Sequence, residues 1–306
     1  MSLGARGITK RFADLVAVDA LDLEARPGEV LAVLGPNGAG KTTTLDMLSG
    51  TTRPDSGEVH WDGKPTQPGH LRRLVGVGPQ TVQTWPRLTC TEQVVFLAKL
   101  HGLGKAAATD RARLLLDRVG LQPKLDAQAR TLSGGMLRRL NIALALVPDP
   151  PAVVLDEPEA GLDPQSRVLV RDLIAELAAD RVVIVTSHDL AEVERVADRI
   201  LILDHGRCIA EGSPRELLDS FDLGQTVDFS VDPADAGTLL TALHRIGAAA
   251  TATGDSVTAR QATDSRGLST LLLAAERCGV PLRGVQTREP SLEDVFLHLT
   301  GRGLRE

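Results

Sequence analysis

Short, uninterrupted apolar runs are the strongest pattern in the first two thirds of the chain. Val30–Leu34 and Ala152–Leu155 contain no polar residue, and Arg181–Thr186 is apolar throughout its centre. Such runs, without alternation, are typical of strands buried on both faces of a sheet. Segments with an apolar position every three or four residues lie between them and predict amphipathic helices. These expected helices cover residues 41–48, about 91–101, 105–119 and 134–147, and about 190–197.

Three weaker patterns predict further strands. Apolar and polar residues partly alternate over Val16–Glu24, as in a half-buried strand. Gly57–Trp61 precedes Asp62-Gly63 and is expected to form one arm of a hairpin, and Leu74–Val77 is a short strand. Strands that alternate with helices indicate a mainly parallel sheet, whose ligands bind at the carboxyl ends of its strands.

The pattern changes near residue 220. From Gln225 onward it predicts the order strand, helix, two short strands, helix and strand, followed by a last helix near 291–300. The two inner helices are expected at about 233–246 and 267–278. This order is similar to a ferredoxin-like module of the α+β class. The chain is therefore expected to hold a first domain over 1–220 and a second over 221–306.

Composition and charge exclude several classes of protein. With 306 residues, 42% hydrophobic and 24% charged, the chain is long enough for two globular domains and is not a disordered chain. Its 34 basic and 40 acidic residues give a net charge of −6, which disfavours nucleic acid as a partner. Aromatic residues make up 2% and Tyr is absent, so a stacking platform for single strands is not expected.

The same composition sets an expectation for the compartment. The longest uncharged stretch, Leu74–Pro86, contains Gly and Pro and is shorter than the roughly 20 apolar residues that span a bilayer. No basic-then-apolar leader opens the sequence. Cys90, Cys208 and Cys278 are odd in number and widely spaced, as expected for reduced thiols in a cytosolic protein.

A glycine-rich loop follows the first buried strand and precedes a predicted helix. Gly35–Thr42 fits the pattern GxxxxGK[ST], in which backbone N–H groups and the helix dipole cradle phosphates. Lys41 would contact the β- and γ-phosphates, and the Thr42 hydroxyl would ligate Mg²⁺. A glycine-rich strand-to-helix turn without a ligand is the alternative. The residues expected to bind nucleotide here are Gly35, Pro36, Asn37, Gly38, Ala39, Gly40, Lys41, Thr42 and Thr43.

An acidic pair ends the second buried strand. Asp156 is placed to hold Mg²⁺, directly or through water, and Glu157 to orient or deprotonate an attacking water. A solvated acidic pair at a strand end is the alternative. Together with the phosphate loop, the pair predicts binding and hydrolysis of a nucleoside triphosphate.

Leu132-Ser133-Gly134-Gly135-Met136 completes a specific resemblance. With the phosphate loop and Asp156-Glu157, this run resembles the ATP-binding subunits of ABC transporters. The resemblance implies an ABC-type P-loop NTPase of the α/β class over 1–220, with a helical subdomain at about 81–147. It also implies that Ser133, Gly134 and Gly135 close over the γ-phosphate of ATP bound by a second subunit. A simple helix cap would explain Ser133 alone.

The resemblance assigns roles to five further residues. Gln80 would reach Mg²⁺ and the attacking water, and His188 would contact the γ-phosphate. Asp163, in Gly161-Leu162-Asp163, would cross the dimer interface toward the nucleotide. Phe12 stands where the family usually stacks Tyr on adenine, and Val18 would lie against the nucleotide. A solvated loop Gln, a structural His and a core Phe are the alternatives.

Two departures and the C-terminal tail bear on the branch of the family. Glu159-Ala160 follow Glu-Pro where the family often has small polar residues. Met136 and then Arg138-Arg139-Leu140 resemble the drug- and antibiotic-exporter branch. The tail resembles that of daunorubicin-resistance-type exporter ATPases, and within it Ser291 is expected to cap a helix with Asp294 at its third position. The tail residues are Glu289-Pro290-Ser291-Leu292-Glu293-Asp294-Val295-Phe296-Leu297 and Leu299-Thr300-Gly301.

The resemblance therefore implies an ATPase subunit that powers a separate membrane exporter. ATP and Mg²⁺ are the expected cofactors, a second copy and a permease the expected partners, and the inner face of the membrane the expected place. The permease is expected to dock over about 81–125. Soluble ABC ATPases of translation or DNA maintenance are the first alternative, although Lys41 and Ser133 are only 92 residues apart, too close for an inserted coiled coil. A regulatory binding protein is the second, and antibiotic, lipid and polysaccharide cargo remain open.

Overall fold

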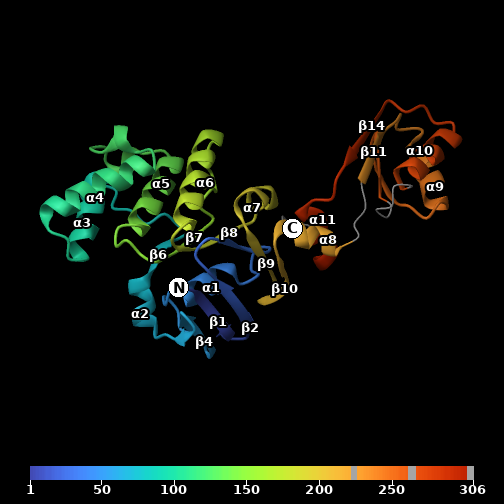
Figure 1. The fold of residues 1–306 in the computed structure, drawn as a ribbon. Coiled ribbons are helices and arrows are strands. Elements are labelled where there is room, and N and C mark those ends of the chain that lie inside the picture. Colours follow the sequence, from blue (N-terminus) through green and yellow to red (C-terminus); the bar gives the residue numbers. More distant parts are fainter. Residues whose placement is uncertain (222–225, 261–266, 302–306) are drawn as a thin grey trace. The chain divides into compact units, whose positions relative to one another are not determined.

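The computed structural model describes residues 1–221, 226–260 and 267–301. Its chain divides into two compact units, Met1–Pro214 and Arg215–Gly303, which are drawn from blue to red in Figure 1. The boundary expected at residue 220 coincides with the end of α8 (Pro214–Ser220) and stays a prediction. Gln225, where the sequence predicted the first strand of the second domain to begin, lies outside the described residues.

A six-stranded sheet forms the centre of the first unit. Its order is β10-β9-β3-β8-β7-β6, and all neighbours are parallel except β10, which pairs with β9 in the antiparallel sense. The apolar runs predicted to be doubly buried are β3, β7 and β8, in which every residue is buried. The bounds are β3 Val30–Leu34, β6 Val75–Gly78, β7 Ala152–Asp156, β8 Val182–Ser187, β9 Arg199–Asp204 and β10 Arg207–Gly212.

Helices connect these strands, and three of them, α3, α4 and α5, form a separate layer (Figure 1). The predicted helices are present with ends shifted by up to three residues, whereas α2, α6 and α8 were not predicted. Helix α3 begins with a capping box, in which Thr89 and Glu92 satisfy each other's backbone N–H groups. The bounds are α1 Lys41–Leu48, α2 Pro68–Leu74, α3 Cys90–Leu100, α4 Lys105–Arg118, α5 Gly134–Ala145, α6 Pro164–Ala178 and α7 Leu190–Val196.

A second, antiparallel sheet with the order β2-β1-β4-β5 packs against α1. Its buried side chains join those of β3 and α1 in one core that includes Leu21, Leu31 and Met47. Asp62 and Gly63 have φ angles of 53° and 72°, as in the tight turn of the predicted hairpin. The bounds are β1 Leu3–Phe12, β2 Leu15–Ala25, β4 Ser56–Trp61 and β5 Lys64–Pro65.

The second unit has the predicted ferredoxin-like order of elements. Its four strands pair antiparallel in the order β12-β13-β11-β14, and apolar side chains of α9 and α10 join those of the sheet in one core. The bounds are β11 Thr226–Ser230, α9 Ala236–Arg245, β12 Ala249–Thr253, β13 Ser256–Arg260, α10 Gly267–Arg277, β14 Gly284–Arg288 and α11 Leu292–Thr300. In the described residues of both units, every helix is too short or too polar to cross a membrane.

Candidate nucleotide site

The glycine-rich loop joins the end of β3 to the first turn of α1. Gly38 and Gly40 have φ angles of 80° and 100°, which side chains rarely allow. A Cβ atom on Gly40 would also lie 2.3 Å from the carbonyl oxygen of Ala17. Glycine therefore lets the loop turn sharply and present backbone N–H groups at the start of α1, which is the arrangement that binds anions.

A cavity of about 290 Å³ opens over this loop. It brings the predicted phosphate loop together with predicted residues from three other parts of the first unit. Gly35 and Pro36 do not line it and instead supply carbonyl oxygens behind it. The lining residues are Phe12, Leu15, Ala17, Asn37, Gly38, Ala39, Gly40, Lys41, Thr42, Thr43, Gln80, Asp156 and Glu157.

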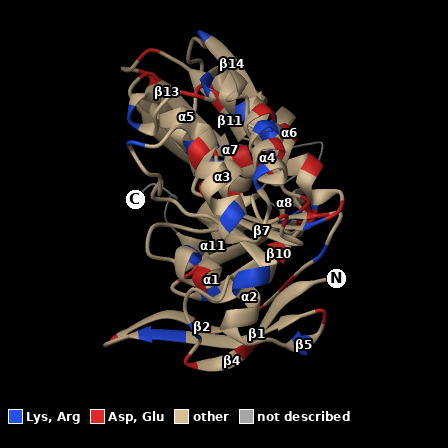
Figure 2. Ribbon diagram, turned by 90° about the vertical axis from the view of Figure 1, so that its left-hand side faces the viewer, with Lys and Arg blue, Asp and Glu red and all other residues tan. Residues whose placement is uncertain are grey.

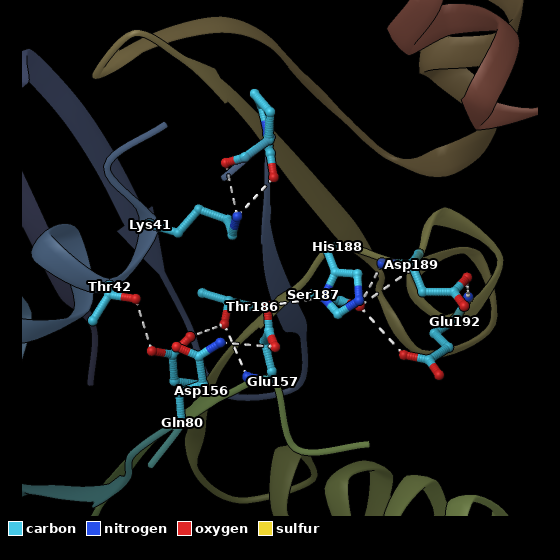
Figure 3. A network of polar contacts seen from close by, with 12 residues as sticks. Lys41, Thr42, Gln80, Asp156, Glu157, Thr186, Ser187, His188, Asp189 and Glu192 are labelled. Atoms are coloured by element: carbon cyan, nitrogen blue, oxygen red, sulfur yellow. Dashed lines mark hydrogen bonds and ion pairs between the residues drawn. The ribbon is translucent and has the colours of Figure 1, made fainter. Parts of the chain in front are cut away.

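The Lys41 ammonium is held inside the loop. Its Nζ donates to the carbonyl oxygens of Gly35 at 2.7 Å and of Pro36 at 3.0 Å (Figure 3). Burial lowers the pKa of Lys41, and the carboxylates of Glu157 and Asp156 oppose that shift. A cation already fixed among backbone dipoles is well placed to contact a phosphate in the cavity.

Asp156, the last residue of β7, lies opposite Thr42 from α1. The Thr42 hydroxyl donates to Asp156 Oδ2 at 2.9 Å, and the Thr186 hydroxyl donates to Oδ1 (Figure 3). A hydroxyl and a carboxylate side by side fit Mg²⁺, which takes oxygen ligands and is commonly held by one or two side chains plus phosphate oxygens. The donor set is therefore compatible with the expected metal.

The side chains that follow three neighbouring strands come together at Glu157. Gln80, after β6, donates its Nε2 to Glu157 Oε2 at 3.0 Å, and His188, after β8, lies with Nδ1 2.8 Å from Oε1 (Figure 3). Glu157 itself has a φ of 50°, a backbone conformation that is uncommon for a residue with a side chain. The structure thus brings together all three residues that the sequence predicted to be catalytic, and their roles stay predictions.

Two residues near the site were not among the predicted site residues. The Thr186 hydroxyl accepts from the Glu157 backbone N at 3.0 Å while it donates to Asp156, so it fixes both acidic residues. Arg138 on α5 donates Nη1 to the carbonyl oxygen of Gln80 at 2.6 Å and lies close enough to Glu157 to interact with it electrostatically. Thr186 is the penultimate residue of a buried strand and directly precedes Ser187-His188. This position at the carboxyl end of the strand is the feature of the sequence from which Thr186 could have been predicted as a site residue.

Phe12 stands at the mouth of the cavity with 50% of its surface exposed. The Lys10 ammonium lies 5.7 Å from its ring centroid and is itself held by Asp55 at 2.8 Å. Val18 is fully buried and does not line the cavity, where Leu15 and Ala17 of the same strand are found instead. The exposed ring suits the predicted stacking of Phe12 on a base.

The remaining predicted residues do not line this cavity. Ser133 caps α5, since its Oγ accepts from Met136 N at 3.3 Å, and Gly134 follows it on the surface. Asp163 caps α6, accepting from Ser166 Oγ at 2.7 Å and from Ser166 N at 3.0 Å, and these two hydrogen bonds hold its pKa below the usual value. Within one copy, Ser133, Gly134 and Gly135 thus do not line the cavity over the phosphate loop.

Comparison with known proteins identifies the family. The family model described as "ABC transporter" matches residues 18–160. Nod factor export ATP-binding protein I of Ralstonia nicotianae is 38% identical over 308 residues, covering 99% of this chain and 95% of the relative. The protein of the same name from Burkholderia pseudomallei (strain K96243) is 44% identical over 216 residues, covering 70% and 71%.

Solved structures agree with this match. A structure described as the ATP binding subunit of an ABC transporter superposes with a TM-score of 0.66 and 28% identity, covering 72% of this chain and 93% of its own. The dimeric structure of MJ0796, a bacterial ABC transporter cassette, gives a TM-score of 0.65 and 25% identity, covering 69% and 98%. Because the sequence identity to these relatives extends over nearly the whole chain and the first unit shares the fold of the solved structures, the chain belongs to the ABC transporter family. It is an ATP-binding subunit that hydrolyses ATP for transport.

Proposed function

We propose that two copies of this chain energise a separate integral-membrane exporter from the inner face of the cell membrane. The observation that carries the proposal is the convergence of Gln80, Glu157 and His188 beside the phosphate loop. A carboxylate oriented by two side chains, next to a site for a triphosphate, suits the activation of water for phosphoryl transfer.

In this proposal the Glu157 carboxylate takes a proton from the water that attacks the γ-phosphorus of ATP. The bond between that phosphorus and the β–γ bridging oxygen breaks, and ADP leaves. Lys41 and the backbone N–H groups of residues 38–42 stabilise charge on the phosphate oxygens. Gln80 and His188 orient the carboxylate, and His188 also donates to a phosphate oxygen once ATP fills the cavity.

Thr42, Asp156 and Gln80 would hold Mg²⁺ beside the phosphates. Thr42 and Asp156 are already within hydrogen-bond distance of each other, so both would be at hand as oxygen ligands for the ion. When bound, the ion neutralises charge on the β- and γ-phosphate oxygens.

A second copy is needed to complete the site. Ser133, Gly134 and Gly135 lie at the start of α5, where backbone N–H groups and the helix dipole attract an anion, yet they do not line the cavity of their own chain. The cassette called dimeric among the similar structures gives a precedent for two copies. We infer that Ser133 and Asp163 of one copy face the nucleotide of the other.

The membrane partner is proposed to dock on the helical layer. A groove of about 550 Å³ there is lined by Val82, Trp85 and Leu97 and by residues of α5. Trp85 and Phe96 pack edge to face and are 42% and 46% exposed. An exposed aromatic pair beside a groove is typical of an interaction surface. Arg138 links α5 to the Gln80 carbonyl, so a helix pressed into the groove can act on the Gln80–Glu157 hydrogen bond.

Export, rather than import, is proposed from the relatives and from the tail. The relatives above are named for Nod factor export. The C-terminal tail adds the resemblance to daunorubicin-resistance-type ATPases, and an antibiotic is then the cargo to test beside Nod factor. The fold of an ATPase does not encode a cargo, because the permease contacts it.

The distribution of charged residues does not favour nucleic acid as a partner. Basic and acidic residues are interspersed along the elements visible in Figure 2. Phosphate backbones are bound by clustered Lys and Arg, so this mixture favours the membrane partner over the soluble alternative.

The test is to capture the tagged chain from detergent-solubilised native membranes and to identify what accompanies it. A stoichiometric partner with several long apolar spans, whose presence raises ATP hydrolysis, supports the proposal. A matched capture with Trp85→Ala and Phe96→Ala is expected to lose that partner and keep ATP binding. Ribosomal or DNA-processing proteins in place of a permease would overturn it.

A further inference from the structure

A buried carboxyl group that the proposed mechanism does not use lies two residues after Glu157. Glu159, in the loop between β7 and α6, is 5% exposed. Its Oε2 makes no hydrogen bond within the described part of the chain, and its closest cation is Arg171 Nε at 3.5 Å. A buried carboxylate with an oxygen that accepts no hydrogen bond is costly, so its presence calls for a functional explanation.

Glu159 belongs to a cluster in which carboxylates outnumber guanidinium groups. It shares a cavity of about 20 Å³, roughly the space of one water, with Glu192 of α7 and with Thr186 and Ser187 of β8. Asp189, in the turn before α7, adds a third carboxylate. His188 of the same turn interacts electrostatically with Glu192. Helix α6 supplies the opposing cations, Arg167 and Arg171, and β8 supplies hydroxyl groups alone. Together with Glu159 itself, the described groups of this cluster thus comprise three carboxylates and two guanidinium ions.

Arg167 connects the two loops next to the active site. Its Nε donates to the carbonyl oxygen of Leu162, in the Gly161-Leu162-Asp163 loop, at 3.1 Å. Its Nη1 lies 2.9 Å from Glu192 Oε1, and Glu192 Oε2 accepts from Ser187 Oγ, the residue before His188, at 3.3 Å. One guanidinium therefore links the loop of Asp163 to the turn that carries His188 (Figure 3 shows the turn).

We propose that Glu159 is a positioning residue that controls this link. When Glu159 is neutral, Arg167 stays on Glu192 and holds the His188 turn against the Asp163 loop. When Glu159 is ionised, it competes with Glu192 for the guanidinium groups of α6 and loosens the link. The inference rests on the proposed roles of His188 and Asp163, and it makes the rate of hydrolysis, rather than the affinity for ATP, depend on Glu159.

The chemistry of the site sets the pH at which this change occurs. Burial, and then the neighbouring charge of Glu192, raise the pKa of Glu159 to about 7, while Arg171 and Arg167 act in the opposite sense. Since the raised pKa belongs to the folded chain, the neutral form is present below pH 7 and is lost as the pH rises through that value.

The experiment compares the wild type, Glu159→Gln and Glu194→Gln as purified full-length chains. Gln keeps the shape of Glu159 and stays neutral, and Glu194 is an exposed carboxylate on α7 that serves as the matched control. The kcat and KM for MgATP are measured from about pH 6 to about pH 8.5. At the alkaline end Glu159→Gln is expected to exceed the wild-type kcat by at least roughly threefold, with equal values at the acid end and unchanged KM.

A second readout does not depend on catalysis. The thermal midpoint of Glu159→Gln relative to the wild type is expected to rise by several degrees between about pH 5 and pH 8, because the wild type alone ionises a buried group. Superimposable pH profiles of kcat, or a midpoint difference that does not change with pH, would overturn the inference. A wild type without hydrolysis at any pH would instead contradict the proposed function, and the midpoint difference would still test Glu159.

Discussion

At the scale of single residues, the site depends on a few side chains fixed from several directions. Glu157 is held by Gln80 and His188 through its carboxylate and by Thr186 through its backbone. Its φ of 50° is a strained value that these contacts maintain. A carboxylate in this position, 10% exposed, can be reached by a water in the cavity and is still oriented by the protein.

Replacing Glu157 by Gln should remove the proton acceptor and keep the shape of the site. We expect kcat for ATP hydrolysis to fall by at least roughly a hundredfold, with KM changed by less than about threefold. Phosphate release under saturating MgATP measures the first value, and ATP binding measures the second. Turnover at the wild-type rate would show that Glu157 is not the base.

Variants of Phe12 test whether its ring stacks on the adenine of ATP at the mouth of the cavity. Phe12→Ala removes the aromatic face and is expected to weaken ATP binding by about tenfold, whereas the matched Phe12→Tyr keeps that face and should stay within about twofold. Equilibrium binding of ATP in the Glu157→Gln background separates the two variants. Equal affinities for Phe12→Ala and Phe12→Tyr would assign the ring to packing alone.

At the scale of elements, caps and ion pairs decide where helices begin and what they pack against. Ser291 and Asp294 form the cap that the sequence predicted for α11. Asp294, which is 5% exposed, also pairs with Arg260 of β13 and with Arg288 of β14 at 2.9 Å. One carboxylate therefore both starts α11 and ties it to the sheet of the second unit.

Asp294→Asn should loosen α11 and lower the stability of the second unit by roughly 2 kcal/mol. Burial raises the pKa of Asp294, but hydrogen bonds from Ser291 and Arg288 outweigh that effect and hold the pKa below its usual range. The stabilisation by the Asp294 carboxylate is thus present above the usual pKa of an aspartate and is lost as the pH falls through the depressed pKa. Urea unfolding of the wild type and of Asp294→Asn at neutral and acid pH measures the difference in their free energies of unfolding. A constant difference between them at all pH values would contradict this account.

The elements also show what a sequence can and cannot predict. β3, β7 and β8 were predicted because doubly buried strands are continuous apolar runs. Strand β1 was missed because Gly4 and Gly7 interrupt it and its pairing with β2 shifts register. Helix α6 was missed although Asp163 and Pro164 mark its start. Contacts such as Arg138 with Gln80 join distant segments, so no local pattern predicts them.

At the scale of the whole molecule, the proposal requires two copies of the chain to form one complete ATP site. The phosphate loop, Asp156 and Glu157 line one cavity, whereas Ser133 and Asp163 cap helices elsewhere in the first unit. If two copies enclose ATP between these surfaces, bound ATP stabilises the closed pair of subunits, and hydrolysis of ATP lets the pair open. This difference in affinity between the two states is what a transport cycle needs.

The most direct test is the mass of the Glu157→Gln chain in solution, measured by light scattering with and without MgATP. The proposal predicts that MgATP adds one copy to the assembly, and that Ser133→Arg in the same background abolishes this association while ATP still binds. A mass that MgATP leaves unchanged, with the nucleotide bound, would contradict the proposal that two copies enclose ATP.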